Sequence, residues 1–440
     1  MTTDTAALLQ TLIRNGCLND GTRDSGQEVR NADALQSFLD GSGLDFQRFE
    51  AVQNRPSLVG RVEGSDPSAP TLCLMGHTDV VSVNPEGWKR DPVGGELVDG
   101  EIWGRGAVDM LNLTSSMAVA VRNVMRSGFK PRGTLIYFAV PDEEAAGVYG
   151  AQHMTENETD AIRCDYLVTE MGGFRFAAEA PQIVLMAAEK GTYWCKITVR
   201  GTPGHGSMPH RTDNALVKAA EIVRRLNAYK PDPLIHEPWR RFVEAMPFPD
   251  GMRMTLLEPR RVEEFADTVP EVGLARMVHA CTHTTFAPTV MSAGIKANVI
   301  PDHAELQVDI RTLPGQSGED IDGMLREALG EFYEDVHIDP TSAMPASSSP
   351  IDTPLYDTLN SITQRLAPGT TTVPFMIVGA TDARFFRKIG ATCYGYGLFS
   401  ERIPFTEFAT MFHGDNERID VESLDLSTQL WEALIREFLG

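Results

Sequence analysis

The chain has 440 residues, of which 42% are hydrophobic and 23% are charged, a composition typical of a soluble globular protein. Its 61 acidic residues outnumber its 39 basic residues, which gives a formal net charge of −22. A field of this sign repels nucleic acids and anionic membrane surfaces, so the composition argues against both as partners. An anionic substrate would need local basic side chains to bind.

The N-terminal segment and the cysteines bear on the compartment. Met1 to Leu12 has neither a basic segment nor a long apolar core, so no secretory leader is expected. No run of about 18 apolar residues occurs, so no transmembrane helix is expected either. The six cysteines are scattered without a Cys-x-x-Cys pair: Cys17, Cys73, Cys164, Cys195, Cys281 and Cys393. These features predict a cytoplasmic protein with free thiols and no cysteine zinc site.

The first part of the chain alternates helix-like and strand-like segments. Ala7–Ile13 and Ala32–Leu39 have helical spacing of apolar residues. Three apolar runs then end abruptly in polar residues, at Thr71–Met75, Thr134–Val140 and Tyr166–Val168. Short apolar runs that alternate with helices predict an α/β domain with a mostly parallel sheet flanked by helices. Open sheets of this kind carry functional residues at the carboxyl ends of their strands.

The pattern changes from Glu189 onward. Strands are predicted at 192–199, 304–311 and 336–338, and helices at 214–227 and 321–329. We interpret residues 189–342 as an inserted α+β domain, with residues 1–188 and 343–440 as the two parts of the first domain. Helices predicted at 355–366 and 424–439 return the chain to that first domain. The Pro- and charge-rich segment 229–283 has no pattern that assigns it.

His77 and Asp79 come directly after the first apolar run, in Gly-His-Thr-Asp. A histidine and a carboxylate two residues apart can place the imidazole on a metal and the carboxylate behind it. The alternative is a histidine whose hydrogen bonds are satisfied at the end of a strand.

Three further carboxylates are candidates for metal chemistry. Asp109 precedes a helix predicted to begin near Asn112, where it could bridge two metals or simply cap the helix. Glu143 and Glu144 follow an apolar strand, and adjacent carboxylates repel each other unless cations or a shared proton compensate. One of the two could ligate a metal while the other takes a proton from water, or both could lie in a solvated loop. Asp142 is interpreted as a bystander.

Glu170 ends the third apolar run, and His413 lies in Phe-His-Gly-Asp near the C-terminus. Neither residue is distinctive alone, but together with the others they form a set of two histidines and several carboxylates. Nitrogen and oxygen ligands without thiolates suit Zn, Mn or Co.

These residues belong to a series of motifs that resembles the dinuclear-zinc aminoacylase/carboxypeptidase family. That family includes acetylornithine deacetylase, succinyl-diaminopimelate desuccinylase, glutamate carboxypeptidase and carboxypeptidase S. The resemblance runs from about Arg23 to the C-terminus. In chain order its motifs are Gly76–Val81, Trp103–Met110, Asp142–Glu144 with Gly147, Gly204–Ser207 with Pro209, Asn298–Pro301, Asp309–Arg311, Thr381–Arg384, and His413 with Asn416–Glu417.

The resemblance implies two divalent cations, zinc first and cobalt or manganese as alternatives, in a zinc-exopeptidase-like catalytic domain. It implies five ligands, with Asp109 bridging the cations, His77 and Glu170 completing one site, and Glu144 and His413 completing the other. Asp79 is then expected to orient His77, and Glu143 to act as general base and acid. A non-proline cis peptide between Asp109 and Met110 is implied as well.

The inserted domain is similar to the ferredoxin-like lid and dimerisation domain of that family. His205 is expected to stabilise the oxyanion, from the partner subunit of a homodimer. Asn298, Arg311 and Arg384 are expected to bind the carboxylate or carbonyl of a small-molecule substrate.

One motif departs from the family pattern. After Asp109-Met110 the family usually has Lys-Gly-Gly, whereas this chain has Leu111-Asn112-Leu113. The change removes a positive charge beside the bridging ligand and leaves the substrate class open.

The sequence therefore predicts a two-metal hydrolase that cleaves an amide bond of an N-acyl amino acid or small peptide with a free carboxylate. Two alternatives stay open. One is an amidohydrolase or deaminase that acts on another C–N bond, such as an aryl amine or an N-carbamoyl group. The other is a non-catalytic binding protein on the same fold, which the presence of Glu143 and all five ligands disfavours.

Overall fold

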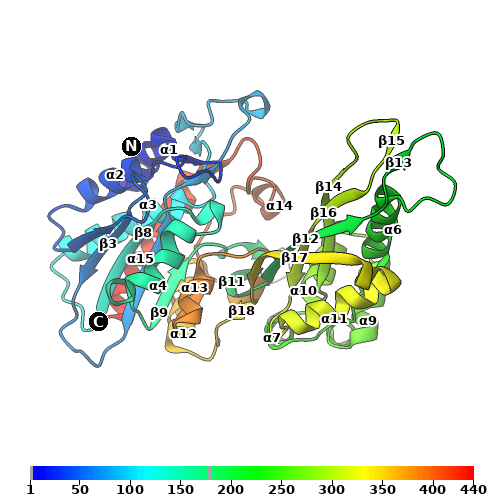
Figure 1. The fold of residues 1–440 in the computed structure, drawn as a ribbon. Coiled ribbons are helices and arrows are strands. Elements are labelled where there is room, and N and C mark those ends of the chain that lie inside the picture. Colours follow the sequence, from blue (N-terminus) through cyan, green and yellow to red (C-terminus); the bar gives the residue numbers. More distant parts are fainter. Residues whose placement is uncertain (1–2, 177–180) are drawn as a thin grey trace. The chain divides into compact units, whose positions relative to one another are not determined.

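The computed structural model describes residues 3–176 and 181–440, which fold into two compact units (Figure 1). Unit 1 comprises Met1–Ala187, Ser349–Phe375 and Thr381–Gly440. Unit 2 comprises Ala188–Ser348 and the short segment Met376–Ala380.

The main sheet of unit 1 has a parallel centre and antiparallel edges. Its strands follow one another in the order β10-β11-β20-β9-β4-β8-β3-β2. Their bounds are β10 (Arg175–Phe176), β11 (Gln182–Glu189), β20 (Thr392–Gly395), β9 (Tyr166–Thr169), β4 (Thr71–His77), β8 (Thr134–Val140), β3 (Ser57–Val62) and β2 (Asp45–Phe49). The neighbours β20–β9, β9–β4 and β4–β8 are parallel, whereas β8–β3 and β3–β2 are antiparallel. The predicted parallel sheet is confirmed at its centre, and β18 (Ser347–Ser348) and β19 (Thr371–Ile377) pair with β11 beyond it.

Helices cover both faces of this sheet, because successive strand side chains point to opposite sides. Leu72 and Leu74 of β4 join one hydrophobic core with residues of α1, α2, α3, α12 and α15. On β8, Tyr137 belongs to that core, whereas the ring of the next residue, Phe138, lies 6.1 Å from Phe386 of α13. The helices of unit 1 are α1 (Asp4–Asn15), α2 (Val29–Leu39), α3 (Leu111–Arg126), α4 (His153–Asn157), α5 (Thr159–Ile162), α12 (Pro354–Leu366), α13 (Ala383–Lys388), α14 (Phe405–Phe408) and α15 (Val421–Phe438).

The remaining elements of unit 1 are short strands and turns that lie within its loops. They are β1 (Leu18–Asn19), β5 (Val80–Val81), β6 (Glu96–Val98), β7 (Glu101–Trp103), β21 (Arg418–Asp420), η1 (Pro85–Gly87), η2 (Glu143–Ala145) and η3 (Val148–Gln152). Of these, η2 follows β8 directly and carries the Glu143–Glu144 pair.

Unit 2 is built on a four-stranded antiparallel sheet with the order β14-β16-β12-β17. The elements are β12 (Gly191–Arg200), α6 (Ala215–Ala228), β14 (Thr285–Ala293), β16 (His303–Thr312), α11 (Gly318–Leu329) and β17 (Val336–Met344). Ile222 of α6 and Leu325 of α11 pack with Ile197, Leu306 and Ile310 of the sheet in one core. This βαββαβ order is the ferredoxin-like arrangement. Short strands β13 (Gly204–His205) and β15 (Val299–Ile300) pair beside it, and η4 (Gly330–Asp335) follows α11.

Four helices occupy the segment that the sequence left unassigned. They are α7 (Glu237–Ala245), α8 (Asp250–Leu256), α9 (Pro259–Thr268) and α10 (Val272–Thr282), inserted between α6 and β14. His236 caps α7 and Glu258 caps α9 through their side chains. Both α7 and α9 have a proline in the first turn. Trp239, Phe242 and Val262 are buried, so the insertion has apolar side chains of its own to pack.

Two expectations about the whole chain are met. All six cysteines lie among the described residues and are free thiols. Within the described ranges, no helix combines the length and the apolar character needed to cross a membrane.

Candidate active site

The carboxyl ends of three neighbouring parallel strands place polar side chains at one edge of the sheet of unit 1. His77 is the last residue of β4 and lies opposite Val140 of β8, so Glu143 and Glu144 follow beside it. Glu170 follows β9, the neighbour of β4 on the other side. This is the edge at which open α/β sheets carry their ligands.

Asp109 and His413 complete the cluster from loops. Asp109 Oδ1 lies 3.2 Å from His77 Nε2, and Asp109 Oδ2 lies 3.3 Å from His413 Nε2. Glu170 Oε2 is 3.7 Å from His77 Nε2, and Glu144 Oε2 is 3.0 Å from His413 Nε2. The two oxygens of Asp109 therefore face one histidine each, with one further carboxylate on either side, which is the arrangement of a bridging ligand.

The donor set fits divalent cations. The ligand atoms of His77, Asp109 and Glu144 lie within 4.8 Å of one another, as do those of His77, Glu143 and Glu170. Glu144 Oε1 is buried and has no hydrogen-bond partner in the described chain. Mixed imidazole and carboxylate donors suit borderline and hard divalent metals.

The raised pKa values in the cluster reflect its excess of negative charge, which a bound cation would balance. Burial, and next the Asp109 carboxylate, raises the pKa of Glu170 to about 8. Burial and the charge of Asp109 also raise the pKa of Glu144. Burial, followed by the charges of Glu170 and Asp382, raises the pKa of Glu143 well above its usual range. Hydrogen bonds to Asp109 and Glu144 raise the pKa of His413 to about 10. Cation binding would replace these protons.

Asp79 holds the main chain of the Glu143–Glu144 turn and also contacts the His77 ring. Its carboxylate accepts hydrogen bonds from the backbone amides of Glu143 (3.2 Å) and Glu144 (3.1 Å), and lies 3.8 Å from His77 Nδ1. The ring donates from Nδ1 to the main-chain carbonyl of Asp79 at 2.9 Å, because a carbonyl can only accept. Asp79 thus contacts the ring most closely through its main-chain carbonyl while its carboxylate fixes the turn, and its role in orienting His77 stays a prediction.

A second buried carboxylate, Glu417, holds the loop that carries Asp109. Glu417 Oε1 accepts from the backbone amides of Val108 (2.6 Å) and Asp109 (2.9 Å), and Oε2 pairs with Arg105 at 3.0 Å. Arg105 also donates to the carbonyl of His413 at 3.3 Å, so one pair holds two candidate ligands. The sequence placed Glu417 in a motif without giving it a role. The peptide bond between Asp109 and Met110 is cis, as predicted.

Comparison with known proteins identifies the family. The model of the family described as "Peptidase family M20/M25/M40" matches residues 73–437, which is most of the chain. The chain belongs to this peptidase family. It is 27% identical to the N-fatty-acyl-amino acid synthase/hydrolase PM20D1 of Xenopus tropicalis, over 96% of this chain and 84% of that protein. It is 26% identical to aminoacylase-1 of Sus scrofa, over 89% of this chain and 86% of that protein.

Solved M20 structures share the fold. The M20 family metallo-carboxypeptidase Sso-CP2 from Sulfolobus solfataricus matches with a TM-score of 0.76 at 14% identity, covering 99% of both chains. Human carnosine dipeptidase 1 matches with a TM-score of 0.68 at 16% identity, covering 99% of this chain and 96% of that one. The predicted family, the α/β fold and the metallohydrolase class are confirmed.

The Leu111-Asn112-Leu113 departure lies at the start of α3 in this M20 chain. Leu111 and Leu113 belong to the hydrophobic core of unit 1. Asn112 is 1% exposed, and neither atom of its side-chain amide has a hydrogen-bond partner in the described part of the chain. The position that usually carries a lysine is therefore apolar and buried here.

Arg384 lies in unit 1, next to the turn that carries the two glutamates. It donates to the carbonyl of Ala146 at 2.9 Å. Its neighbour Asp382 is buried, with no hydrogen-bond partner for either carboxylate oxygen among the described residues. Burial, opposed by the charge of Arg384, raises the pKa of Asp382 to about 7.

The candidate residues of unit 2 are solvent-accessible and paired locally. His205 is exposed, and its Nδ1 lies 2.7 Å from the Ser207 hydroxyl and accepts from the Ser207 amide at 3.2 Å. Asn298 is also exposed and lies beside it, because the Gly206 amide donates to the Asn298 carbonyl at 2.9 Å. The guanidinium of Arg311 is engaged in two hydrogen bonds to Asp309, at 2.7 and 3.0 Å.

Proposed function

We propose that this M20 chain hydrolyses the amide bond of N-acyl amino acids or small peptides that carry a free carboxylate. The observation that supports this most is the position of Asp109, whose two oxygens face His77 and His413. The relatives named N-fatty-acyl-amino acid synthase/hydrolase and aminoacylase-1 support N-acyl amino acids as the substrate class.

Two divalent cations would be held by the five candidate ligands, with Asp109 shared, His77 and Glu170 on one side, and Glu144 and His413 on the other. Zinc suits this donor set, with manganese or cobalt as alternatives. Bound there, such ions supply Lewis-acid polarisation of a carbonyl and lower the pKa of water.

Glu143 would act as the proton carrier. It is half-buried beside the candidate ligand Glu144, and its raised pKa brings it closer to the range in which a carboxylate can accept and return a proton near neutral pH. The carboxylate takes a proton from the attacking water and delivers it to the amide nitrogen. The oxygen of that water becomes part of the new acid, and the C–N bond breaks as the amine leaves.

Groups that carry positive charge or a donor would bind the rest of the substrate. His205 would serve as the oxyanion donor through Nε2, because its Nδ1 accepts from the Ser207 amide. Arg384, Asn298 and Arg311 would recognise the carboxylate or carbonyl, with Arg311 exchanging its Asp309 partner for the substrate.

An aromatic pocket in unit 1 supports an apolar acyl group. Its cavity of about 370 Å³ is of ligand size. Phe174, Phe399, Phe405 and Phe408 line it, and Phe174 follows Glu170 by four residues. The Phe174 ring also lies 5.7 Å from that of Phe412, the residue before His413. The pocket is therefore built from the continuations of two ligand-bearing segments.

A homodimer through unit 2 is supported by an exposed strand. Within the described residues β14 is an edge of the unit 2 sheet, and Val290 and Met291 on it are 51% and 40% exposed. Val217 of α6, which packs beside this sheet, is 64% exposed. Apolar edges of this kind are normally covered by a partner. The free thiols support a reducing compartment such as the cytoplasm.

The test is a hydrolysis panel with and without a metal chelator. It contains an N-acetyl and an N-long-chain-acyl amino acid, the decarboxylated counterpart of each, a dipeptide and an N-carbamoyl amino acid. We expect cleavage of the carboxylate-bearing amides, faster with the long acyl chain, lost with chelator and restored by zinc. Cleavage of the carbamoyl compound alone would favour the other C–N hydrolase, and no turnover by metal-loaded protein would contradict amide hydrolysis.

A further inference from the structure

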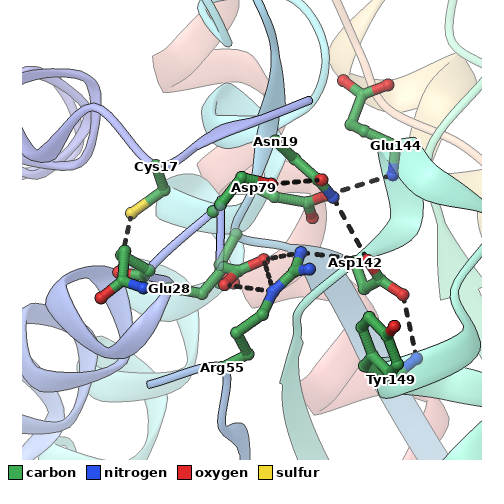
Figure 2. Close-up of polar contacts among 12 residues, drawn as sticks. Cys17, Asn19, Glu28, Arg55, Asp79, Asp142, Glu144 and Tyr149 are labelled. Carbon is green, nitrogen blue, oxygen red and sulfur yellow. Dashed lines mark hydrogen bonds and ion pairs between the residues drawn. The ribbon is translucent and has the colours of Figure 1, made fainter. Parts of the chain in front are cut away.

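A buried ion pair lies behind the turn that carries Glu143 and Glu144 (Figure 2). The side chains of Arg55 and Glu28 are fully buried. Arg55 Nε donates to Glu28 Oε2 at 2.9 Å, and Arg55 Nη2 donates to Glu28 Oε1 at 2.5 Å. The same Nη2 lies 3.0 Å from Asp142 Oδ1, so one guanidinium joins two carboxylates.

Asp142 connects this pair to both ends of the turn. Its Oδ2 accepts from the backbone amide of Tyr149 at 2.9 Å, and its main-chain carbonyl accepts from Gly147 at 2.7 Å. Asp142 itself has a left-handed backbone with φ of +73°, a conformation that tertiary contacts must hold. The residue that the sequence suggested as a bystander is thus an anchor of the turn.

Asn19 links Asp142 to Asp79. Asn19 Nδ2 donates to Asp79 Oδ2 at 2.8 Å and to Asp142 Oδ1 at 3.3 Å. Because the Asp79 carboxylate accepts from the amides of Glu143 and Glu144, the whole chain of contacts ends on the candidate base and a candidate ligand (Figure 2).

Arg55 brings a positive charge into a network that contains three carboxylates. Glu28, Asp79 and Asp142 are three buried carboxylates. Arg55 is the cation that contacts two of them, Glu28 and Asp142. Removing it would take the ion pair from Asp142, which lies across Asn19 from a second carboxylate, Asp79, whose own basic neighbour is His77 at 3.8 Å. Repulsion between the two carboxylates would be relieved by movement of the turn.

We propose that Arg55 is a positioning residue of the active site, which acts through Asp142 to fix the turn bearing Glu143 and Glu144. The inference rests on the proposed function for its consequence in turnover. Its structural part, the placement of the turn, stands without that function.

The competing explanation is that Arg55 only neutralises Glu28 and so serves stability. A double variant separates the two. Arg55→Met alone leaves Glu28 charged and buried, which can unfold the protein. Glu28→Gln combined with Arg55→Met removes the unpaired buried charge of Glu28 but still deprives Asp142 of its ion pair. Under the stability explanation the double variant behaves like the parent chain.

The experiment compares the parent chain, the double variant and Leu434→Ala. Leu434 is a buried residue of α15 in the core of unit 1, so its truncation lowers stability without touching the turn. On metal-depleted protein, hydrogen–deuterium exchange of a peptide spanning residues 142–149 and the affinity for Zn²⁺ are measured. On zinc-loaded protein, kcat and KM are measured with the best substrate of the panel.

In the double variant we expect faster exchange of the 142–149 peptide and a Zn²⁺ affinity reduced by about 10–100-fold. We expect kcat to fall by about 10–100-fold, while KM changes less than about threefold because the turn does not bind the substrate carboxylate. Leu434→Ala should match the parent in all four quantities while melting at a lower temperature.

Parent-like exchange, zinc affinity and kcat in the double variant would overturn the proposal and leave Arg55 as a structural ion pair. A parent chain without any hydrolysis would instead refute the proposed function. The exchange and zinc arms would then still decide whether Arg55 positions the turn.

Discussion

The two units hold their candidate residues in opposite ways. In unit 1, His77, Asp109 and Glu170 are at most 7% exposed and lie within hydrogen-bonding or ion-pairing distance of one another. In unit 2, His205 and Asn298 are exposed, and their hydrogen bonds within the described ranges go to residues of their own loop and its neighbouring strand. Two buried carboxylates that are not among the candidate ligands, Asp79 and Glu417, fix the loops of the first group.

The contrast separates side chains whose positions the fold fixes from side chains that solvent and substrate can reach. The unit 1 cluster is held in place by buried hydrogen bonds, and it brings like charges close together. The unit 2 residues contribute little to folding, so they are free to meet a substrate. Substitutions of the five candidate ligands in unit 1 should therefore change catalysis and metal binding, and those in unit 2 should change catalysis alone.

The largest effect is expected for Glu143→Ala. Turnover should fall by ~10²–10⁴-fold because the proton carrier is lost. Both metals should stay bound because this residue is not among the five proposed ligands. Metal analysis of the purified variant together with kcat checks this. Loss of stoichiometric metal would mean that the roles of Glu143 and Glu144 are exchanged.

His205→Ala should lower kcat by ~10²–10³-fold, the usual effect of removing one oxyanion donor. Since the side chain is exposed, the melting temperature and the metal content should equal those of the parent. Ser207→Ala is the comparison variant: it removes the hydroxyl 2.7 Å from Nδ1 but keeps the ring and the amide that donates to Nδ1, so it should cost far less activity. A drop in stability as large as a core truncation would contradict the contrast between the units.

Mixing His205→Ala chains with Glu143→Ala chains tests whether the two units act across a dimer. If His205 serves the partner's site, a mixed dimer contains one site with both groups intact. With random exchange about half the dimers are mixed, so about a quarter of parental activity should return. No recovery, despite subunit exchange demonstrated with labelled chains, would assign His205 to its own chain's site.

The smallest effect concerns the pH dependence of unit 2. Burial, followed by the charge of the stacked His279, lowers the pKa of His283 to about 4. The unfolded chain binds this proton near the ordinary value of about 6.5, so it holds more protons than the folded chain between those values. The contribution of the neutral His283 to stability is therefore fully present above pH 6.5 and falls by on the order of 3 kcal/mol toward pH 4.

Thermal melts of His283→Phe, which keeps a ring to stack on His279, should show a weaker acid dependence than those of the parent. The exposed His210→Gln is the control and should melt like the parent at each pH. Equal acid sensitivity of His283→Phe and the parent would contradict this account.

Much of the site could be predicted from the sequence because the apolar runs end directly at functional residues. The strands that stop at His77, Val140 and Thr169 are visible as apolar segments, and the polar residues that follow meet by the geometry of a parallel sheet. Asp109 and His413 were open candidates from the sequence, and only the resemblance gave them definite roles, because each lies in a loop whose path no local pattern shows.

The rest could not be predicted because it depends on long-range contacts. Arg55 and Asp142 are 87 positions apart, and nothing local indicates that they pair or that Asp79 bonds amides instead of the imidazole. In unit 2, helices α7 to α10 are short and begin at prolines or atypical caps such as His236. Their apolar faces are too brief to give a helical period against a charged background.

The most direct measurement is a titration of metal-depleted protein with Zn²⁺, following bound metal and hydrolysis of an N-acyl amino acid in the same samples. The central claim is that the unit 1 cluster is a two-cation hydrolytic centre bridged by Asp109. We expect two bound ions per chain, no activity without metal, and full activity only when both sites are filled. We expect Asp109→Ala to lose both sites. Full activity in metal-free protein, or two tight sites that survive in Asp109→Ala, would contradict the claim.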